Sequence, residues 1–116
     1  RPDGGILLDM VCDSELRIPR ELYSKRYAGK LQNRLWGVAK ELQLSVVEEH
    51  DGAAISDDHL PFLRAGIPMV NLIHWPFPDS WHTHQDTLER CSSNNLAEVG
   101  RWITAVIYKA DQPAAR

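Results

Sequence analysis

The amino-acid sequence predicts an α/β fold, a three-layer α/β/α sandwich, and three observations lead to this class. An apolar run at residues 5–13 (GILLDMVCD) is typical of a strand covered on both faces. Between residues 29 and 42, apolar side chains recur at helical spacing. The expected elements also alternate along the chain, in the order strand, helix, strand, short helix, strand, long loop and helix. Such alternation favours a largely parallel sheet.

The first half of the chain supplies two strands, a connector and a helix. Residues 16–24 (LRIPRELYS) form a mixed connector, because Pro19 disfavours a helix across them. The helix over residues 29–42 has one apolar face at i, i+4, i+7 and i+11, made by Leu31, Leu35, Val38 and Leu42. Residues 45–51 (SVVEEHD) predict a short strand.

The segment SDDHLPFLRAGIPMVNLI (56–73) combines a short helix with a strand. Asp57 or Asp58 can cap the helix, because both carry side-chain oxygens that accept from helix N–H groups. Pro61 lies in the first turn, and Gly66 ends the helix. The strand is PMVNLI.

A helix over residues 92–110 closes the chain after a long loop at 74–91. Asn95 with Glu98 resembles a capping box at its start. The helix presents one apolar face, made by Leu96, Val99, Ile103, Val106 and Ile107.

Composition bounds the classes of function. The chain has 116 residues, which suits one domain with a core, and 43% of them are hydrophobic. Its 13 basic and 16 acidic residues give a net charge of −3 without a basic stripe, so nucleic acid is not an expected partner. No apolar run approaches the roughly 20 residues that span a bilayer. The opening RPDGG is a turn-rich lead rather than a start at Met, and we expect the domain to begin upstream.

Two cysteines, Cys12 and Cys91, are too few for a disulfide framework and have no metal-binding spacing. They can form one bridge or none. We expect buried thiols, and the sequence leaves the compartment open.

Polar residues that can carry chemistry fall at the expected carboxyl ends of the strands, where open α/β sheets bind ligands. Asp9 and Asp13 end the first strand, residues 56–59 open the short helix, and a third cluster follows the last strand: Trp81, His82, His84 and Asp86. Acids and imidazoles that converge from separate strand ends would suit Zn²⁺ in a site left open for substrate.

Each candidate also has a structural explanation. Asp9 can be a buried carboxylate satisfied by backbone amides, although a charge there is costly unless paired. Asp57 and Asp58 can be helix caps, or adjacent carboxylates that share a proton and transfer it. His59, at a helix start, is more typical of a structural role.

The histidine pair after the last strand leaves two arrangements open. On a strand, His82 and His84 would share a face and chelate together, whereas in a loop only one of them need be a ligand. Trp81 can belong to the core or wall a pocket.

Two motifs carry a resemblance to a known family. DDHLPFLRAGIPMVNLI followed by PFPDSWHT resembles the C-terminal half of the glutaminyl-peptide cyclotransferases, which share a superfamily with the zinc-dependent, leucyl-aminopeptidase-like exopeptidases. ILLDMV and DTLERCSSNNLAEVGRWI are similar to that superfamily as well, so the resemblance covers nearly the whole chain. It implies a zinc exopeptidase-like sandwich around a mixed, mostly parallel sheet, with zinc at the strand ends.

The resemblance also implies roles for individual residues. His82 corresponds to a zinc ligand, and Trp81 and Phe77 correspond to walls of the pocket for the substrate's N-terminal side chain. Asp57 corresponds to part of an acidic hydrogen-bond relay. Asp9 corresponds to a relay acid in the one-zinc cyclases and to a metal ligand in the two-zinc aminopeptidases.

The chain departs from the family pattern in two ways. Asn71, expected to contact the substrate, stands where the animal cyclases have a second pocket histidine. The other zinc ligands of the family, an aspartate and a glutamate, and its general-base glutamate would lie upstream of Asp9. Residues 1–116 are therefore expected to form the C-terminal part of one catalytic domain, to need its N-terminal half, and to be inactive alone.

The leading functional hypothesis is zinc-dependent cyclisation of N-terminal glutamine of peptides to pyroglutamate, with release of ammonia. The alternative is a zinc aminopeptidase with a two-zinc site, and a second alternative is a non-catalytic domain of the same fold. The partner implied is the N-terminus of a peptide. The resemblance favours a secreted, periplasmic or luminal protein.

Overall fold

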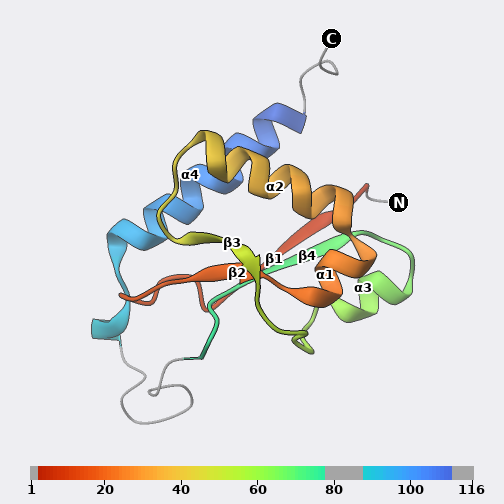
Figure 1. The fold of residues 1–116 in the computed structure, drawn as a ribbon, viewed down its shortest axis with the longest axis horizontal. Coiled ribbons are helices and arrows are strands. Elements are labelled where there is room, and N and C mark those ends of the chain that lie inside the picture. Colours follow the sequence, from red (N-terminus) through yellow and green to blue (C-terminus); the bar gives the residue numbers. More distant parts are fainter. Residues whose placement is uncertain (1–2, 78–87, 111–116) are drawn as a thin grey trace.

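The computed structural model describes residues 3–77 and 88–110, which form an α/β fold (Figure 1). The elements, in chain order, are β1 (Gly5–Asp9), β2 (Ile18–Arg20), α1 (Leu22–Tyr27), α2 (Gly29–Glu41), β3 (Val47–Asp51), α3 (Leu60–Arg64), β4 (Met69–Ile73), the 3₁₀ helix η1 (Leu88–Arg90) and α4 (Ser93–Ala110). None of the described helices is long and apolar enough to cross a membrane.

The strands form two parallel pairs, β1 with β4 and β2 with β3. In the first pair the register runs from Gly5 opposite Met69 to Asp9 opposite Ile73. Because both strands point the same way, their carboxyl ends lie at one edge. The predicted parallel arrangement is confirmed, and Asp9 lies at this edge.

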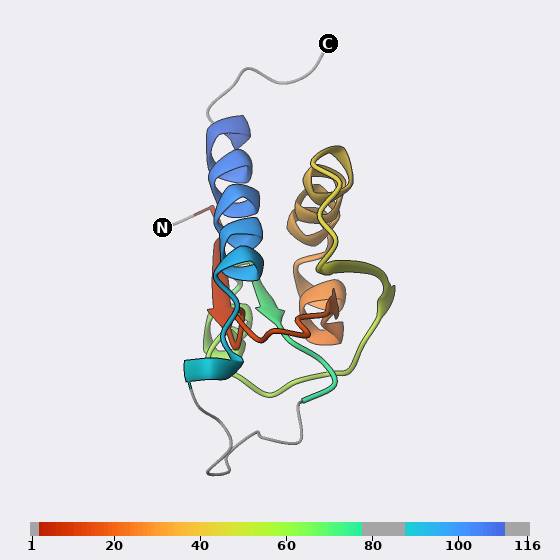
Figure 2. The same ribbon diagram turned by 90° about the vertical axis from the view of Figure 1, so that its left-hand side faces the viewer.

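The core lies where α2 and α4 pack side by side over the strands (Figures 1 and 2). Trp36 of α2 and Trp102 of α4 meet edge to face, with ring centroids 5.2 Å apart. Each indole N–H donates to a carbonyl at 2.7 Å, Trp36 to Glu48 and Trp102 to Leu35. Both tryptophans are therefore buried with their polar atoms satisfied, which is what large aromatic core residues require.

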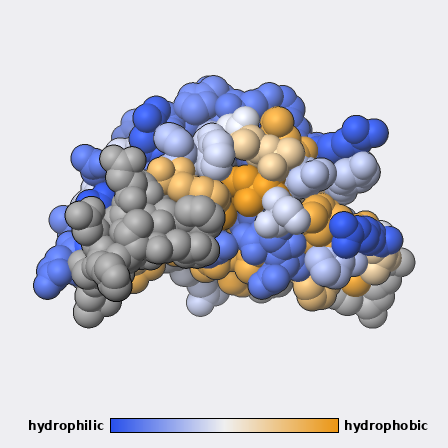
Figure 3. Space-filling model, turned by 90° about the horizontal axis from the view of Figure 1, so that it is seen from below, coloured by the Kyte–Doolittle hydropathy of each residue, from blue (hydrophilic) through white to orange (hydrophobic). Residues whose placement is uncertain are grey.

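The opposite face of the molecule shows apolar surface near its middle, bordered by hydrophilic side chains (Figure 3). Leu8 of β1 is 45% exposed. The expectation that this strand is covered on both faces is therefore wrong for the described part of the chain. β1 is also shorter than predicted, because Met10 adopts a left-handed backbone with φ of 54° directly after it.

The predicted connector at residues 16–24 is wrong, because it contains β2 and the start of α1. Pro19 does not prevent this helix, since it lies within the three-residue strand and precedes the helix N-cap. That cap is Glu21, whose carboxylate accepts from the N–H groups of Tyr23 and Ser24.

The closing helix forms as predicted, but with a different cap. The hydroxyl of Ser92 accepts from the N–H of Asn95 at 3.1 Å. The expected capping box is wrong, since the Asn95 side chain donates to the Asp13 carbonyl at 2.9 Å and Glu98 accepts from the N–H of Ser45 at 2.9 Å. Tertiary partners outcompete the local pairing at both positions.

The buried face of α4 contains fewer residues than the sequence pattern predicts. Val99 and Val106 are buried together with Trp102, whereas Leu96 is 46% and Ile107 is 55% exposed. In α2 the predicted face is confirmed, with Leu35 and Val38 in the core and Leu31 and Leu42 packed against it.

Cys12 and Cys91 form a disulfide, with Cα atoms 4.7 Å apart, so the expectation of buried thiols is wrong. The backbone brings them together through an antiparallel bridge between Asp13 and Cys91 and a hydrogen bond from Ser14 N to Arg90 O at 2.6 Å. We call residues 12–14 and 90–92 the disulfide junction. This contact joins segments far apart in the chain, and no local sequence pattern announces it.

Candidate functional site

Three of the residues selected from the sequence converge at the carboxyl end of β1. Asp9 ends that strand, Asp57 lies in the segment before α3, and Asn71 lies in β4. The carboxyl groups of Asp9 and Asp57 are hydrogen-bonded to each other, and the Asn71 amide donates to Asp57 Oδ2 at 3.1 Å. We call Asp9 and Asp57 the acid pair.

The surroundings of the acid pair favour a proton between its two carboxyl groups. Burial, the hydrogen bond with Asp57 and the nearby charges of Asp57 and Asp58 raise the pKa of Asp9 to about 6. Burial opposes ionisation of Asp57 as well, but hydrogen bonds from Asp9, the Asp58 N–H and Asn71 hold the pKa of Asp57 below its usual value. Below about pH 6 the proton therefore resides on Asp9 and is donated to the Asp57 carboxylate.

This geometry corrects two expectations about the pair of adjacent aspartates. The side chain of Asp57 is hydrogen-bonded to Asp9, whereas Asp58 contributes its backbone N–H, which donates to Asp57 Oδ1 at 2.8 Å. Neither aspartate caps α3, because the N-cap position is His59, which makes no side-chain cap bond. Gly66 does end the helix, with φ of 79°.

The remaining predicted site residues are only partly described. Phe77 is half-buried and packs edge to face against Trp75, with ring centroids 4.9 Å apart. Trp81, His82, His84 and Asp86 lie outside the described residues. Their predicted roles stay predictions, as does the role of Phe77 as a pocket wall.

Zinc cannot be held by the described residues alone. Within residues 3–77 and 88–110, no group of three or more histidine, cysteine, aspartate or glutamate side chains could bind a metal ion. The acid pair offers carboxylate oxygens, which zinc accepts, but a complete site needs further ligands such as an imidazole.

The sequence did not single out Glu21, whose carboxylate is buried. Its Oε1 accepts from His59 Nε2 at 2.7 Å, and both side chains are 0% exposed. The contact agrees with the structural role that the sequence favoured for His59. Glutamate is rarely buried, and the only sequence signal was an acid directly before the helical segment LYSKRY.

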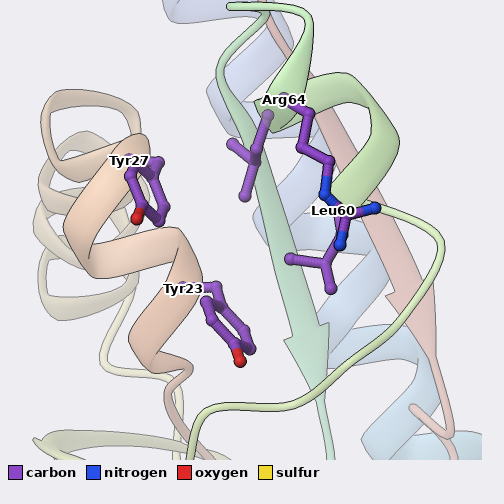
Figure 4. Close-up of a pocket in the computed structure, with 5 residues that line it drawn as sticks. Tyr23, Tyr27, Leu60 and Arg64 are labelled. Carbon is purple, nitrogen blue, oxygen red and sulfur yellow. The ribbon is translucent and has the colours of Figure 1, made fainter.

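A separate cavity of about 470 Å³ lies between α1 and α3 (Figure 4). It is lined by Tyr23, Tyr27, Leu60, Leu63 and Arg64. None of these residues belongs to the acid pair.

Comparison with known proteins decides the family. Residues 3–107 match the model of peptidase family M28. The chain belongs to this family. Glutaminyl-peptide cyclotransferase from Bos taurus is 45% identical over 51 residues, which cover 41% of this chain and 14% of that protein. The resemblance drawn from the sequence is confirmed.

Solved structures of two kinds share the fold. Porphyromonas gingivalis glutaminyl cyclase superposes with a TM-score of 0.92 at 31% identity, covering 95% of this chain and 43% of that one. A leucine aminopeptidase precursor from Bacteroides thetaiotaomicron gives 0.90 at 32% identity, covering 97% and 39%. The zinc exopeptidase-like α/β fold is therefore confirmed, and this chain spans less than half the length of those structures.

Proposed function

We propose that this chain is the C-terminal part of the catalytic domain of a zinc-dependent glutaminyl-peptide cyclotransferase, which cyclises N-terminal glutamine of peptides to pyroglutamate and releases ammonia. The observation that carries the proposal is the acid pair, because a proton shared between two carboxylates at a strand end is a proton that can be transferred. Family membership and the similarity to glutaminyl cyclases support it.

The reaction requires a proton to move between two nitrogen atoms. The α-amine of the substrate attacks the carbonyl carbon of its own side chain, a C–N bond forms, and the bond to the side-chain nitrogen breaks. The amine loses a proton, and the departing nitrogen gains one to leave as ammonia. Asp9 and Asp57 are placed to hold this proton and deliver it.

Four further residues complete the proposed site, and two of them, Trp81 and His82, lie outside the described part. His82 would serve as a ligand of zinc, which when bound would polarise the carbonyl group that is attacked. Trp81 and Phe77 wall the pocket and keep the side chain folded toward the amine, which supplies the proximity that an intramolecular attack needs. Asn71 orients Asp57 through its amide.

An aminopeptidase is the second candidate, favoured by the comparable similarity to the leucine aminopeptidase precursor. In that case Asp9 would be a ligand of a second zinc ion and would be ionised throughout the working pH range. The hydrogen bond between the side chains of Asp9 and Asp57 supports the relay role instead. A non-catalytic domain is the third candidate, but nothing in a purely structural domain requires the acid pair.

Two measurements on the protein that carries this chain test the proposal. The zinc content of the purified protein should be one ion per chain, and a peptide with N-terminal glutamine should release ammonia. Asp9→Asn and Asp57→Asn should each lower the turnover by roughly 10²-fold or more. Two zinc ions and hydrolysis of aminoacyl substrates would favour the peptidase, whereas absence of zinc and of both activities would favour the non-catalytic domain.

The assignment of the zinc ligand has its own test. His82→Ala should remove zinc and activity while the protein stays folded, and the matched control His84→Ala should have a mild effect. Equal losses from both substitutions would show that the wrong imidazole was chosen or that the two histidines chelate together.

We further propose that the protein works in an oxidising compartment, either secreted or in a periplasmic or luminal space. The support is the disulfide between Cys12 and Cys91, because such bonds persist chiefly where thiols are not kept reduced. Thiol labelling of the native protein with and without reductant tests this. Two free thiols in protein isolated from its own source under thiol-blocking conditions would contradict it.

A further inference from the structure

The carboxylate of Glu21 is the meeting point of separate segments of the chain. Oε2 accepts from the N–H groups of Tyr23 at 2.7 Å and Ile55 at 3.0 Å. Oε1 accepts from the N–H of Ser24 at 2.9 Å, from its hydroxyl at 2.7 Å and from His59 Nε2 at 2.7 Å. We call Glu21, Ser24 and His59 the Glu21 hub.

The hub fixes both ends of the segment that carries Asp57. Ile55 precedes Asp57 by two residues and His59 follows it by two, and both donate to the same carboxylate. The position of Asp57 is therefore fixed by the hydrogen bonds of its neighbours Ile55 and His59 to Glu21. The short helix α3 does not fix it, because its N-cap makes no side-chain hydrogen bond.

A second route connects the hub to the acid pair. The Ser24 hydroxyl donates its proton to Glu21 and accepts from the N–H of Asn71 at 2.9 Å. The side chain of Asn71 then donates to Asp57 Oδ2 at 3.1 Å. The same carboxylate thus governs both the backbone around Asp57 and the amide that orients its oxygen atoms.

Capping of α1 does not account for this arrangement. A side-chain cap needs only one accepting oxygen at the start of the helix, and a surface serine or aspartate provides it. Glu21 is 1% exposed, and burial of a carboxylate is costly unless every oxygen is satisfied. Two of its donors, Ile55 and His59, lie outside α1, so they serve the segment that carries Asp57 and not the helix.

We propose that Glu21 is a positioning residue, which acts through Ile55, His59 and Ser24 to hold Asp57 against Asp9. This inference rests on the proposed function only in using turnover as one of its measurements. Glu21 itself touches no residue of the acid pair, so its effect on the reaction passes entirely through Asp57.

The variant that tests the hub is Glu21→Gln, which keeps the size of the side chain but replaces one accepting oxygen by a donor. In the zinc-loaded protein, kcat should fall roughly 10- to 100-fold with KM nearly unchanged, because a small displacement of a proton-transfer group has this effect. The matched control is Glu98→Gln, which also removes a carboxylate that accepts from a backbone N–H and a hydroxyl, those of Ser45, without any bond to the acid pair. Its kcat should stay within about twofold of the parent.

A double-mutant cycle separates positioning from general damage. Since Glu21 acts through Asp57, Glu21→Gln combined with Asp57→Asn should be no slower than Asp57→Asn alone. Independent, multiplicative losses would overturn the proposal. Should Glu21→Gln fail to fold, Ser24→Ala interrupts the second route alone and should lower kcat in the same non-additive way, by a smaller factor.

A measurement that needs no turnover distinguishes failure of the hub from failure of the proposed function. A crystal structure of the Glu21→Gln protein should show Asp57 displaced from Asp9, and amide exchange at Ile55 should quicken relative to the parent. An inactive parent protein with this displacement would leave the hub correct and the cyclase wrong. An unmoved Asp57 would overturn the hub whatever the activity.

Discussion

The Glu21 hub and the disulfide junction both fix segments that carry candidate site residues, but by different physical means. The hub is a buried polar cluster in which the side chains of Glu21 and His59 are 0% exposed. The junction is a covalent link between Cys12 and Cys91, 79 positions apart, reinforced by backbone hydrogen bonds. One acts by satisfying groups in the folded state, and the other chiefly by restricting the unfolded chain.

The two regions also hold different parts of the site. The hub sets the position of Asp57. The junction anchors the chain at Cys91, after residues 78–87. Before them, the chain is anchored to Arg17: Trp75 N donates to the Arg17 carbonyl at 3.0 Å, and His74 Nδ1 accepts from Arg17 N at 3.0 Å. The described residues on both sides of 78–87, the range that contains the proposed zinc ligand His82, are therefore anchored to the segment 12–17. Polar contacts thus position the single side chain of Asp57, whereas the disulfide and backbone hydrogen bonds anchor the two segments that flank residues 78–87.

The largest effect is expected from breaking the hub at His59. His59→Ala removes a donor from the buried Glu21 carboxylate and leaves a cavity at a fully buried side chain, so it should lower the free energy of unfolding by about 3–5 kcal/mol. Urea denaturation measures it. The matched control is His50→Ala, since His50 is an exposed histidine bonded to Glu48 at 3.0 Å, and no measurable change is expected there. Similar losses from the two substitutions would mean that burial of the hub contributes little.

Removal of the disulfide should have the next largest effect. Cys12→Ser with Cys91→Ser should lower the free energy of unfolding by about 2–4 kcal/mol, because the unfolded chain regains the freedom that a long closed loop had restricted. Comparison of the variant with the parent, each with and without reductant, gives the value. A reductant-sensitive parent and a reductant-insensitive variant are expected. A loss below about 1 kcal/mol would indicate that the backbone bridge holds the junction without the covalent bond.

The acid pair should make stability depend on pH. The folded-state pKa of Asp9, about 6, exceeds the usual 3.8, so the folded protein retains a proton that the unfolded chain loses. Its contribution is complete below about pH 4 and disappears as the pH rises through 6. Asp9→Asn mimics the protonated acid at every pH. In metal-free protein, the stability of the parent relative to this variant should therefore fall between pH 4 and pH 7, and a constant difference in denaturation midpoints would contradict the shared proton.

The smallest effect is expected at the edge of the junction. Asn95→Ala removes hydrogen bonds from the side chain to the carbonyls of Asp13 at 2.9 Å and Ser14 at 3.2 Å but leaves its backbone cap bond intact. The free energy of unfolding should fall by about 1 kcal/mol. Exposed Asn94 in the same helix turn is the control, with a change within about 0.5 kcal/mol. Thermal denaturation compares the two alanine variants. Equal losses of stability would show that the side chain of Asn95 does not stabilise the disulfide junction.

Much of the fold was predictable because it depends on local patterns. The apolar spacing of α2 determined which side chains face the core, and Leu35 and Val38 are buried as predicted. Gly66 ends α3 because a left-handed backbone favours glycine. By contrast, the prediction for residues 16–24 was wrong because it took Pro19 to exclude a helix. Pro19 excludes a helix only if it lies inside one, and α1 begins three residues after it, at Leu22.

The sequence predicted several residues of the site, but it did not predict most of the contacts between them. The family resemblance selected Asp9 and Asp57 together as relay acids, whereas the residues alone left Asp57 open as a helix cap or as a partner of its neighbour Asp58. The pairing depends on β4, which lies beside β1 in parallel register and whose Asn71 donates to Asp57. Glu21 was missed for the same reason, because its donors Ile55 and His59 come from a distant segment.

The sequence by itself determined the alternation of helices and strands, the core faces of the helices and the family, since each is written in short-range spacing or in contiguous motifs. Only the tertiary structure decided that Cys12 and Cys91 are bonded, that Asn71 donates to Asp57, and that Glu21 is buried and bonded to His59. These depend on contacts between residues tens of positions apart. A side chain's partner and its pKa are properties of the space around it, which forms only when the strands have paired and the helices have packed.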